Sequence, residues 1–331
     1  MPTLTAYFGT SVSSFLIRNG QDIEFVKFPY VYSKGLFSNQ CSESQFYRYL
    51  IETILRERNI SLGSCDVSVC GFFEPPDFAF GPNVSCSVVD TISSSDKFYP
   101  VFIADSSLIT KDIISSYSDF TDRKSKDDIE PNFFSNLAIF PQVVPSDLSD
   151  QANLDENISG KVPNGLTISS DTPVVFTGDR FAQNVTDKGL NYILMMELIK
   201  SAGIYNLYLD GNNKVSLINL LDREFDTLSY TSRVGTFINT TGSVECLLST
   251  GVGDDQFFEV KKDHIYVMPL NSESEVKLSV KSTDLGSREV KVLGGTLGLI
   301  FDTREHKGSI YTDVKLFNDL LKQVDRVLVN K

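Results

Sequence analysis

The segment Gly9-Thr10-Ser11 has the composition of a phosphate-binding turn. It separates two runs that are predicted as β-strands, residues 4–8 and 12–18. A turn of this composition between two strands can point backbone N–H groups and two hydroxyls at an anion. We therefore predict that Gly9, Thr10 and Ser11 form an anion-binding turn.

Two more polar turns follow predicted strands. Gly178-Asp179 comes after the strand 173–177 and precedes a predicted helix, and ligands of parallel sheets collect at such carboxyl ends. Asp105-Ser106-Ser107 follows the strand 98–103. Asp105 would contribute to a second phosphate loop, but the segment lacks glycine, so an ordinary Asx/Ser turn is the favoured interpretation.

Other catalytic signatures are absent from the sequence. The only two histidines, His264 and His306, lack metal-ligand spacing and a local Gly-x-Ser-x-Gly motif. No Walker A motif and no Gly-x-Gly-x-x-Gly motif occurs. Asp302 and Arg304 follow an apolar strand, and we favour a local ion pair over a role in a site. Four carboxylates lie in predicted loops near strand ends, namely Glu74, Asp77, Asp105 and Asp179, and they would bind a metal if these loops converged. We favour the alternative in which they are separate and solvated.

The composition predicts a cytoplasmic protein with a sizeable core. The chain has 331 residues, including 24 Phe and 13 Tyr, and a net charge of −13. This charge argues against nucleic acid and against an anionic membrane surface as partners. The five cysteines, without a secretion signal, indicate reduced thiols. No apolar run reaches the length of a membrane-spanning helix.

The first hundred residues predict three strands, a helix and further strands. Asn19-Gly20 predicts a type I′ hairpin turn between residues 12–18 and 21–27. Residues 42–58 predict a helix, since Leu50 and Ile54 share one face and Ser42 with Gln45 would form a capping box. Residues 65–73 and 98–103 predict the next strands.

The middle of the chain predicts a parallel sheet covered by helices. The order is a strand at 173–177, a helix at 187–202 that is apolar on both flanks, a strand at 204–209 and a short helix at 215–225. Gly203 occupies the expected helix-stop position. Residues 145–170 are rich in Asp, Asn, Ser and Gly, which predicts a long surface connection.

After residue 231 the pattern changes to short strands with turn signals between them. Their spacing is typical of a sandwich or barrel, and they span residues 234–239, 244–249, 257–260, 265–268, 276–280, 289–293 and 296–301. Residues 312–329 predict a closing amphipathic helix. We favour its packing on the body over a role as a partner helix.

Two sets of residues resemble the actin-like ATPase superfamily (ASKHA). The turn Gly9-Thr10-Ser11 resembles its first phosphate-binding hairpin, and Gly178-Asp179 resembles its adenosine loop. In the last part of the chain, residues 235–238, 264–270 and 293–304 look like the end of MutL-type proteins, which are associated with cobalamin-dependent glutamate mutase. The match is best at Gly294, Gly295, Gly298, Asp302 and Arg304.

The resemblance implies an α/β fold with a duplicated actin-like (RNase H-like) body and a C-terminal β-rich sandwich or barrel module. The body would cover residues 1–227, with halves at about 1–95 and 96–227. The module with its closing helix would cover residues 228–331. The implied ligands are ATP and Mg²⁺, held by Gly9, Thr10, Ser11, Asp105, Gly178 and Asp179.

One departure from the superfamily points to a degenerate nucleotide site. The position that normally carries the magnesium-binding Asp, two residues before the first glycine, is Tyr7. Without that carboxylate the triphosphate charge is poorly neutralised. The first hypothesis is therefore a cytosolic scaffold or chaperone-like partner of other proteins. The alternatives are an active Mg-ATP-dependent ATPase and a structural assembly subunit, which includes a homo-oligomer.

Overall fold

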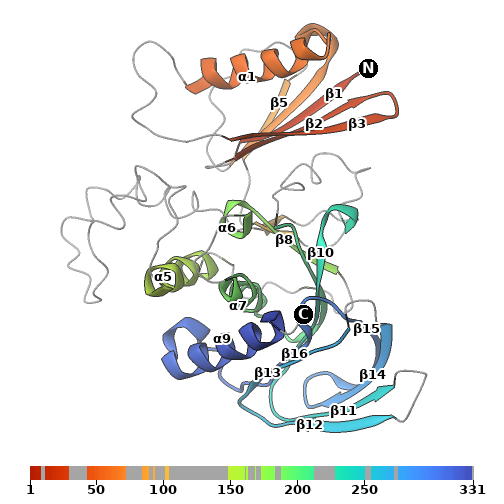
Figure 1. Ribbon diagram of the computed structural model, residues 1–331, viewed down its shortest axis with the longest axis vertical. Helices are drawn as coiled ribbons and strands as arrows, with labels where there is room; N and C mark the ends of the chain where they lie inside the picture. Colours follow the sequence, from red (N-terminus) through yellow and green to blue (C-terminus); the bar gives the residue numbers. More distant parts are fainter. Residues whose placement is uncertain are drawn as a thin grey trace, which may run out of the picture.

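The computed structural model has a mixed α/β architecture with three β-sheets (Figure 1). Among the residues that the structure describes, no helix is both long and apolar enough to cross a membrane. The described residues are 1–8, 12–29, 43–71, 84–88, 92–93, 101–103, 148–160, 162, 168, 173–182, 188–211, 228–249, 255–271 and 275–329.

Sheet A holds the first five strands in the order β3-β2-β1-β4-β5. The strands are β1 (Thr3–Phe8), β2 (Val12–Asn19), β3 (Asp22–Pro29), β4 (Asp66–Gly71) and β5 (Val84–Val88). β1, β2 and β3 form an antiparallel meander, whereas β4 and β5 run parallel to β1. Only β2 therefore runs against the other four strands. The three predicted N-terminal strands and their order are confirmed.

The predicted hairpin turn is shifted by one residue. Asn19 pairs with Asp22 as the last rung of the ladder, so Gly20 and Gln21 are the two turn residues. Gly20 has a φ of 66°, whereas Gln21 is not among the described residues with positive φ. Because a type I′ turn needs positive φ at both central positions, the predicted turn type is wrong. Gly at the first central position alone is the type II′ pattern.

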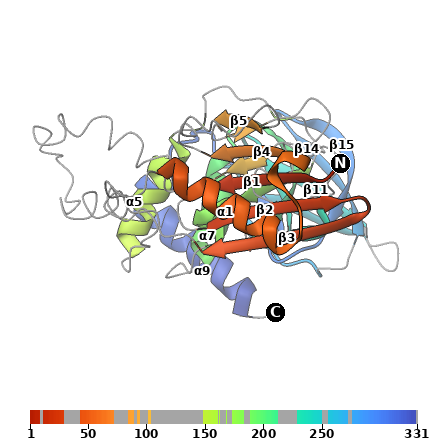
Figure 2. The ribbon, with the colours of Figure 1, turned by 90° about the horizontal axis from the view of Figure 1, so that it is seen from above.

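One face of sheet A is covered by α1 (Glu43–Glu57), which lies across the strands (Figure 2). Leu50, Ile51 and Ile54 of the helix pack against Leu4 and Phe15 of the sheet. The predicted helix is confirmed. Its spacing of apolar residues every three or four positions creates the face that the alternating apolar residues of β1 bury. A 3₁₀ turn, η1 (Leu62–Ser64), leads from α1 into β4.

Sheet B is the largest sheet, with the order β13-β16-β10-β9-β8-β7-β6. The pairs β7–β8, β8–β9 and β10–β16 are parallel, and the remaining pairs are antiparallel. Its strands are β6 (Ile92–Ser93), β7 (Val101–Ile103), β8 (Pro173–Thr177), β9 (Gly203–Leu209), β10 (Ser232–Asn239), β13 (Ile265–Met268) and β16 (Gly298–Asp302).

Helices α5 (Leu148–Ser159), α7 (Gly189–Leu198) and α9 (Val314–Val329) share one core with sheet B. In α7 every residue except Tyr192 is buried, which confirms a helix with two apolar flanks. The helix ends at Leu198, and Gly203 begins β9 instead of ending the helix. The amphipathic α9 packs on α7 and β13, as predicted for a closing helix.

The prediction of a surface connection over residues 145–170 is wrong, because α5 occupies much of it. The Asp, Asn and Ser residues have low helix propensity, which led to that prediction. However, Leu154 and Ile158 lie one turn apart and are buried in the core of sheet B. Burial of this face outweighs the weak local propensity of the segment.

Sheet C, with the order β12-β11-β14-β15, packs on the other face of sheet B. Ile238 and Phe301 from sheet B share a core with Cys246 and Leu278 from sheet C. All seven strands predicted after residue 231 are confirmed, but they divide between the two sheets. β9 and β10 also pair with each other, although residue 228, the predicted start of the C-terminal module, lies between them in the chain. The strands of sheet C are β11 (Val244–Ser249), β12 (Gln256–Val260), β14 (Glu275–Ser282) and β15 (Gly286–Leu293).

The backbones of β10 and β16 approach so closely that only glycine fits between them. Gly235 has a φ of 149°, and a Cβ placed there would overlap the carbonyl oxygen of Gly298. A Cβ on Gly295 would lie 2.5 Å from the carbonyl carbon of Val234. The Gly-rich run before Asp302 therefore has a packing role in the structure.

Several predicted features lie outside the described residues. They are the turn Gly9-Thr10-Ser11, the Asp105 loop, the Ser42 cap and the helix at 215–225. Three short elements complete the described chain, namely α6 (Asp179–Ala182), η2 (Leu228–Tyr230) and η3 (Ile310–Thr312).

Candidate functional site

The carboxyl ends of β8 and β9 bring several polar residues to one edge of sheet B. The Thr177 hydroxyl donates a hydrogen bond to Asp210 Oδ2 at 2.9 Å, and the Asp210 N–H donates to the Phe176 carbonyl at 2.9 Å. Thr177 and Asp210 are both buried. Since the two strands are parallel neighbours, their following residues meet at the edge where α/β proteins bind ligands.

Gly178 provides the turn from β8 into α6. Its φ is 113°, a conformation that side-chain-bearing residues rarely adopt. The N–H of Phe181 donates to the Gly178 carbonyl at 3.1 Å and closes the turn. The sequence prediction that a glycine turn at 178 follows a strand of a parallel sheet is confirmed, and α6 begins directly at Asp179.

A buried ion pair connects α6, which follows this turn, to α5. Arg180 donates from Nε to Asp155 Oδ1 and from Nη2 to Asp155 Oδ2, each at 2.6 Å, and from Nη1 to Asn191 Oδ1 at 2.8 Å. The Tyr311 hydroxyl donates to Asp155 Oδ2 at 3.4 Å. Residues from α5, α6, α7 and η3 are thereby tied together around one guanidinium.

Electrostatics of this pair reflect its burial. Arg180 is 1% exposed and Asp155 is fully buried. Desolvation raises the pKa of Asp155, and the charge and hydrogen bonds of Arg180 oppose that rise. Burial also raises the pKa of Tyr311, so its phenol stays protonated and can donate to Asp155. The bidentate geometry indicates a structural clamp in which each guanidinium nitrogen already donates to a protein group.

The structure describes only part of the predicted nucleotide site. Gly178 and the start of α6 at Asp179 lie at the β8 edge. β1 ends at Phe8, directly before the predicted turn of residues 9–11, and β7 ends at Ile103, two residues before Asp105. Gly9, Thr10, Ser11 and Asp105 themselves lie outside the described residues.

Sequence reasoning missed Thr177, Asp210, Arg180 and Asp155. Asp210 directly follows an apolar strand in the same way as Gly178-Asp179, so its position after β9 was a usable signal. Arg180 and Asp155 are 25 residues apart in the chain, and no local pattern connects them. Their pairing depends on α5, which was not predicted.

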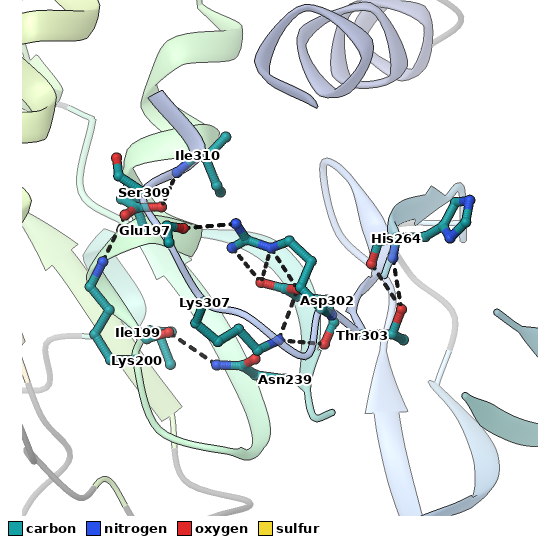
Figure 3. Close-up of polar contacts among 12 residues, drawn as sticks. Glu197, Ile199, Lys200, Asn239, His264, Asp302, Thr303, Lys307, Ser309 and Ile310 are labelled. Atoms are coloured by element: carbon teal, nitrogen blue, oxygen red, sulfur yellow. Dashed lines mark hydrogen bonds and ion pairs between the residues drawn. The ribbon is translucent and has the colours of Figure 1, made fainter. Parts of the chain in front are cut away.

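A second polar cluster lies at the carboxyl ends of the parallel strands β10 and β16 (Figure 3). Arg304 Nη2 lies 2.8 Å from Asp302 Oδ2, which confirms the predicted local ion pair. Lys307 Nζ contacts Asp302 Oδ1 at 2.8 Å and donates to the carbonyls of Thr240 and Asp302 at 2.9 and 3.0 Å. Burial by itself raises the pKa of Asp302, but Arg304 and Lys307 together hold it below its usual value.

The cluster in Figure 3 also anchors the end of α7. Asn239 Nδ2 donates to the carbonyls of Ile199 and Ser201 at 3.1 and 3.0 Å, and Glu197 accepts from the N–H of Ile310 at 3.1 Å. Asn239 Oδ1 is buried without a hydrogen-bond partner in the described part of the chain. Because the Lys307 ammonium already has three acceptors, we interpret this cluster as structural. It connects the ends of β10 and β16 to the end of α7.

An open hollow of about 410 Å³ lies at the end of sheet A where β1 and β4 begin. Arg18, Thr3 and Asp66 form one row across β2, β1 and β4, and the hollow is also lined by Thr5 and Ser68. Thr3 and Asp66 begin β1 and β4, and Arg18 lies near the carboxyl end of the antiparallel β2, whereas the predicted phosphate turn follows the carboxyl end of β1. The hollow is therefore separate from the predicted nucleotide site.

Metal ligands do not gather in the described part of the chain, where no group of three or more His, Cys, Asp or Glu side chains is suited to hold an ion. His264 lies at the surface, with Nδ1 2.6 Å from the Lys262 carbonyl oxygen. Comparison with known proteins finds no matching family model, no matching curated protein and no matching solved structure.

Proposed function

We propose that this chain is a degenerate actin-like nucleotide-fold protein that acts as a scaffold or chaperone-like partner of other proteins. The observation that carries the proposal is the strand order of sheet A, β3-β2-β1-β4-β5, with only β2 antiparallel to the rest. This is the order of the RNase H-like unit that actin-like proteins duplicate, and α1 joins β3 to β4 as that unit requires.

The proposed degeneracy is supported by Tyr7. In the proposed assignment this residue would stand where actin-like proteins carry the magnesium-binding carboxylate, and it is fully buried on β1. A buried phenol cannot replace a carboxylate that holds the waters of Mg²⁺. Any ATP bound by Gly9, Thr10 and Ser11 would keep much of its triphosphate charge uncompensated, which weakens binding and hydrolysis.

The edge of β8 and β9 supports a residual adenosine contact. Gly178 lies directly after a parallel strand, and Thr177 with Asp210 places hydroxyl and carboxylate groups at the same edge. In the proposed assignment this edge faces the base or ribose, while the phosphates lie toward residues 9–11 and Asp105.

A melting experiment with nucleotide tests the proposal. The melting temperature is measured with Mg-ATP, with Mg-ADP, with ATP plus a chelator, and without ligand. A ligand at 100 times its dissociation constant stabilises the folded state by about 2.7 kcal/mol, which gives a clear shift. We expect no magnesium-dependent shift at millimolar nucleotide.

The other outcomes identify the alternatives. A shift that requires magnesium, together with ATP turnover lost in Thr10→Ala and Asp105→Asn, would replace the scaffold proposal with an active Mg-ATP-dependent ATPase. Concentration-dependent growth into polymers, followed by sedimentation, would replace it with a structural assembly subunit.

A further inference from the structure

The strand β12 lies at one end of sheet C, with β11 on its only paired side in the described chain. Figure 1 shows β12 at the outer margin of the molecule, at the opposite end from sheet A. An edge strand presents unpaired N–H and C=O groups along its outer side. A second extended segment can pair with such an edge and continue the sheet.

An aromatic side chain stands on the outward face of this edge. Phe257 is 69% exposed, the highest exposure of any described aromatic residue. It pairs across the ladder with Leu247, which is only partly buried. Phe257 and Leu247 thus give the edge an apolar contact for a side chain of an incoming strand.

The charges beside Phe257 are acidic and uncompensated. Glu259 and Asp255 are exposed, and neither forms an ion pair among the residues that the structure describes. In contrast, Glu245 pairs with Lys281 at 2.9 Å and Glu289 pairs with Lys277 at 3.3 Å on the same face of the sheet. Among the acidic side chains that the structure describes on this face of sheet C, Glu259 and Asp255 at the β12 edge are therefore the ones without an ion pair.

We infer that β12 binds an extended segment of a partner protein in which basic residues alternate with apolar ones. The segment adds as a strand next to β12, places an apolar side chain against Phe257 and brings Lys or Arg toward Glu259 and Asp255. This inference rests on the proposed scaffold function, because it names the surface and the partner chemistry through which a scaffold would work.

The alternative occupant is a second copy of this chain, and the charges disfavour it. Pairing two β12 edges would bring Glu259 and Asp255 of one copy toward the same carboxylates of the other. The net charge of −13 adds repulsion over a longer range. A basic segment meets neither penalty.

Binding of short peptides to the full chain tests the inference. The probes are a fluorescent seven-residue peptide that alternates lysine and valine, its glutamate–valine counterpart, and the lysine peptide with N-methyl groups on alternate residues. N-methylation removes N–H donors that a ladder needs while retaining the charge. We expect the lysine peptide to bind at least tenfold more tightly than either of the other two.

Matched variants separate strand addition from general attraction to an acidic protein. Glu259→Lys and Glu289→Lys change the net charge by the same amount on the same face, but only Glu259 lies on β12. We expect Glu259→Lys to lose the preference for the lysine peptide and Glu289→Lys to keep it. Phe257→Ser should weaken binding about tenfold, since an apolar contact is lost.

Three results would overturn the inference. They are equal binding of the methylated and unmethylated lysine peptides, equal effects of the two Lys variants, and a concentration-dependent dimer that Glu259→Lys alone alters. Circular dichroism spectra of the variants establish that each is folded. The nucleotide melting experiment reads a different part of the chain, so failure at β12 and failure of the actin-like proposal give separate signatures.

Discussion

The Arg180 guanidinium and the Asp155 carboxylate face each other in a bidentate pair, with both N···O distances at 2.6 Å. Both side chains are buried, and they join α5 to α6, the helix that follows the Gly178 turn after β8. Removing one member of a buried pair leaves an uncompensated charge, which typically costs 3–5 kcal/mol. The pair therefore links the stability of α5 to the geometry of the candidate site.

Arg180→Met should lower the free energy of unfolding by about 3–5 kcal/mol in urea denaturation. The double variant Arg180→Met with Asp155→Leu should lose clearly less, because no charge remains buried alone. As a control, Arg48→Met removes the exposed Arg48–Glu52 pair and should cost under about 1 kcal/mol. Equal losses for the single and double variants would contradict the clamp.

Asp302 should make stability depend on acid pH. Because Arg304 and Lys307 hold its folded-state pKa below the ordinary value, its contribution is fully present above that ordinary value and is lost as the pH falls through the folded-state pKa. Asp302→Asn should destabilise the protein at pH 7 by about 3 kcal/mol or more. The urea midpoints of variant and parent should converge as the pH drops below about 4. A constant gap down to pH 2 would refute this account.

Gly235→Ala should destabilise the fold strongly, by about 3 kcal/mol or more, because its Cβ would overlap the Gly298 carbonyl. Gly63→Ala is the matched control, since nothing lies within 4 Å of a Cβ at that position and its φ is not positive. Thermal melting of the two variants provides the comparison. Similar melting temperatures would mean that β10 and β16 are not in close contact.

Thr177→Val should remove the hydroxyl that donates to Asp210 and lower the free energy of unfolding by about 1–3 kcal/mol. Thr177→Ser keeps the donor and should retain most of the stability. Denaturant titration of both variants measures the difference. If Thr177→Ser, which loses the methyl group, were more destabilising than Thr177→Val, which keeps it, methyl packing would be the cause instead of the hydrogen bond.

The two cysteines described by the structure as free and buried, Cys65 and Cys246, should resist thiol reagents in the folded protein. Burial raises the pKa of Cys65 to about 11 and that of Cys246 to about 12, so almost no thiolate exists at pH 8. Mass spectrometry after alkylation should find both unlabelled until denaturant is added. Rapid labelling of Cys246 in native protein would show that the core between sheets B and C opens.

Local pattern was sufficient for most of the regular elements. The strand-forming run of β1 and the helical spacing of Leu50 and Ile54 are short-range signals, and they predicted strand and helix where the structure has them. The same holds for the Asp302–Arg304 pair, whose members are two residues apart. A glycine turn after β8 was likewise visible, because Gly178 directly follows a run of strand-forming residues.

Contacts between distant residues decided the rest. Leu154 and Ile158 form a helix because the core of sheet B buries them, against the propensity of their Asp, Asn and Ser neighbours. The seven C-terminal strands divide between two sheets because β10 and β16 pair through facing glycines, a relationship across more than sixty residues. Short-range sequence patterns describe a segment's own preference, whereas sheet membership and buried ion pairs depend on which surfaces meet, and only the tertiary fold determines that.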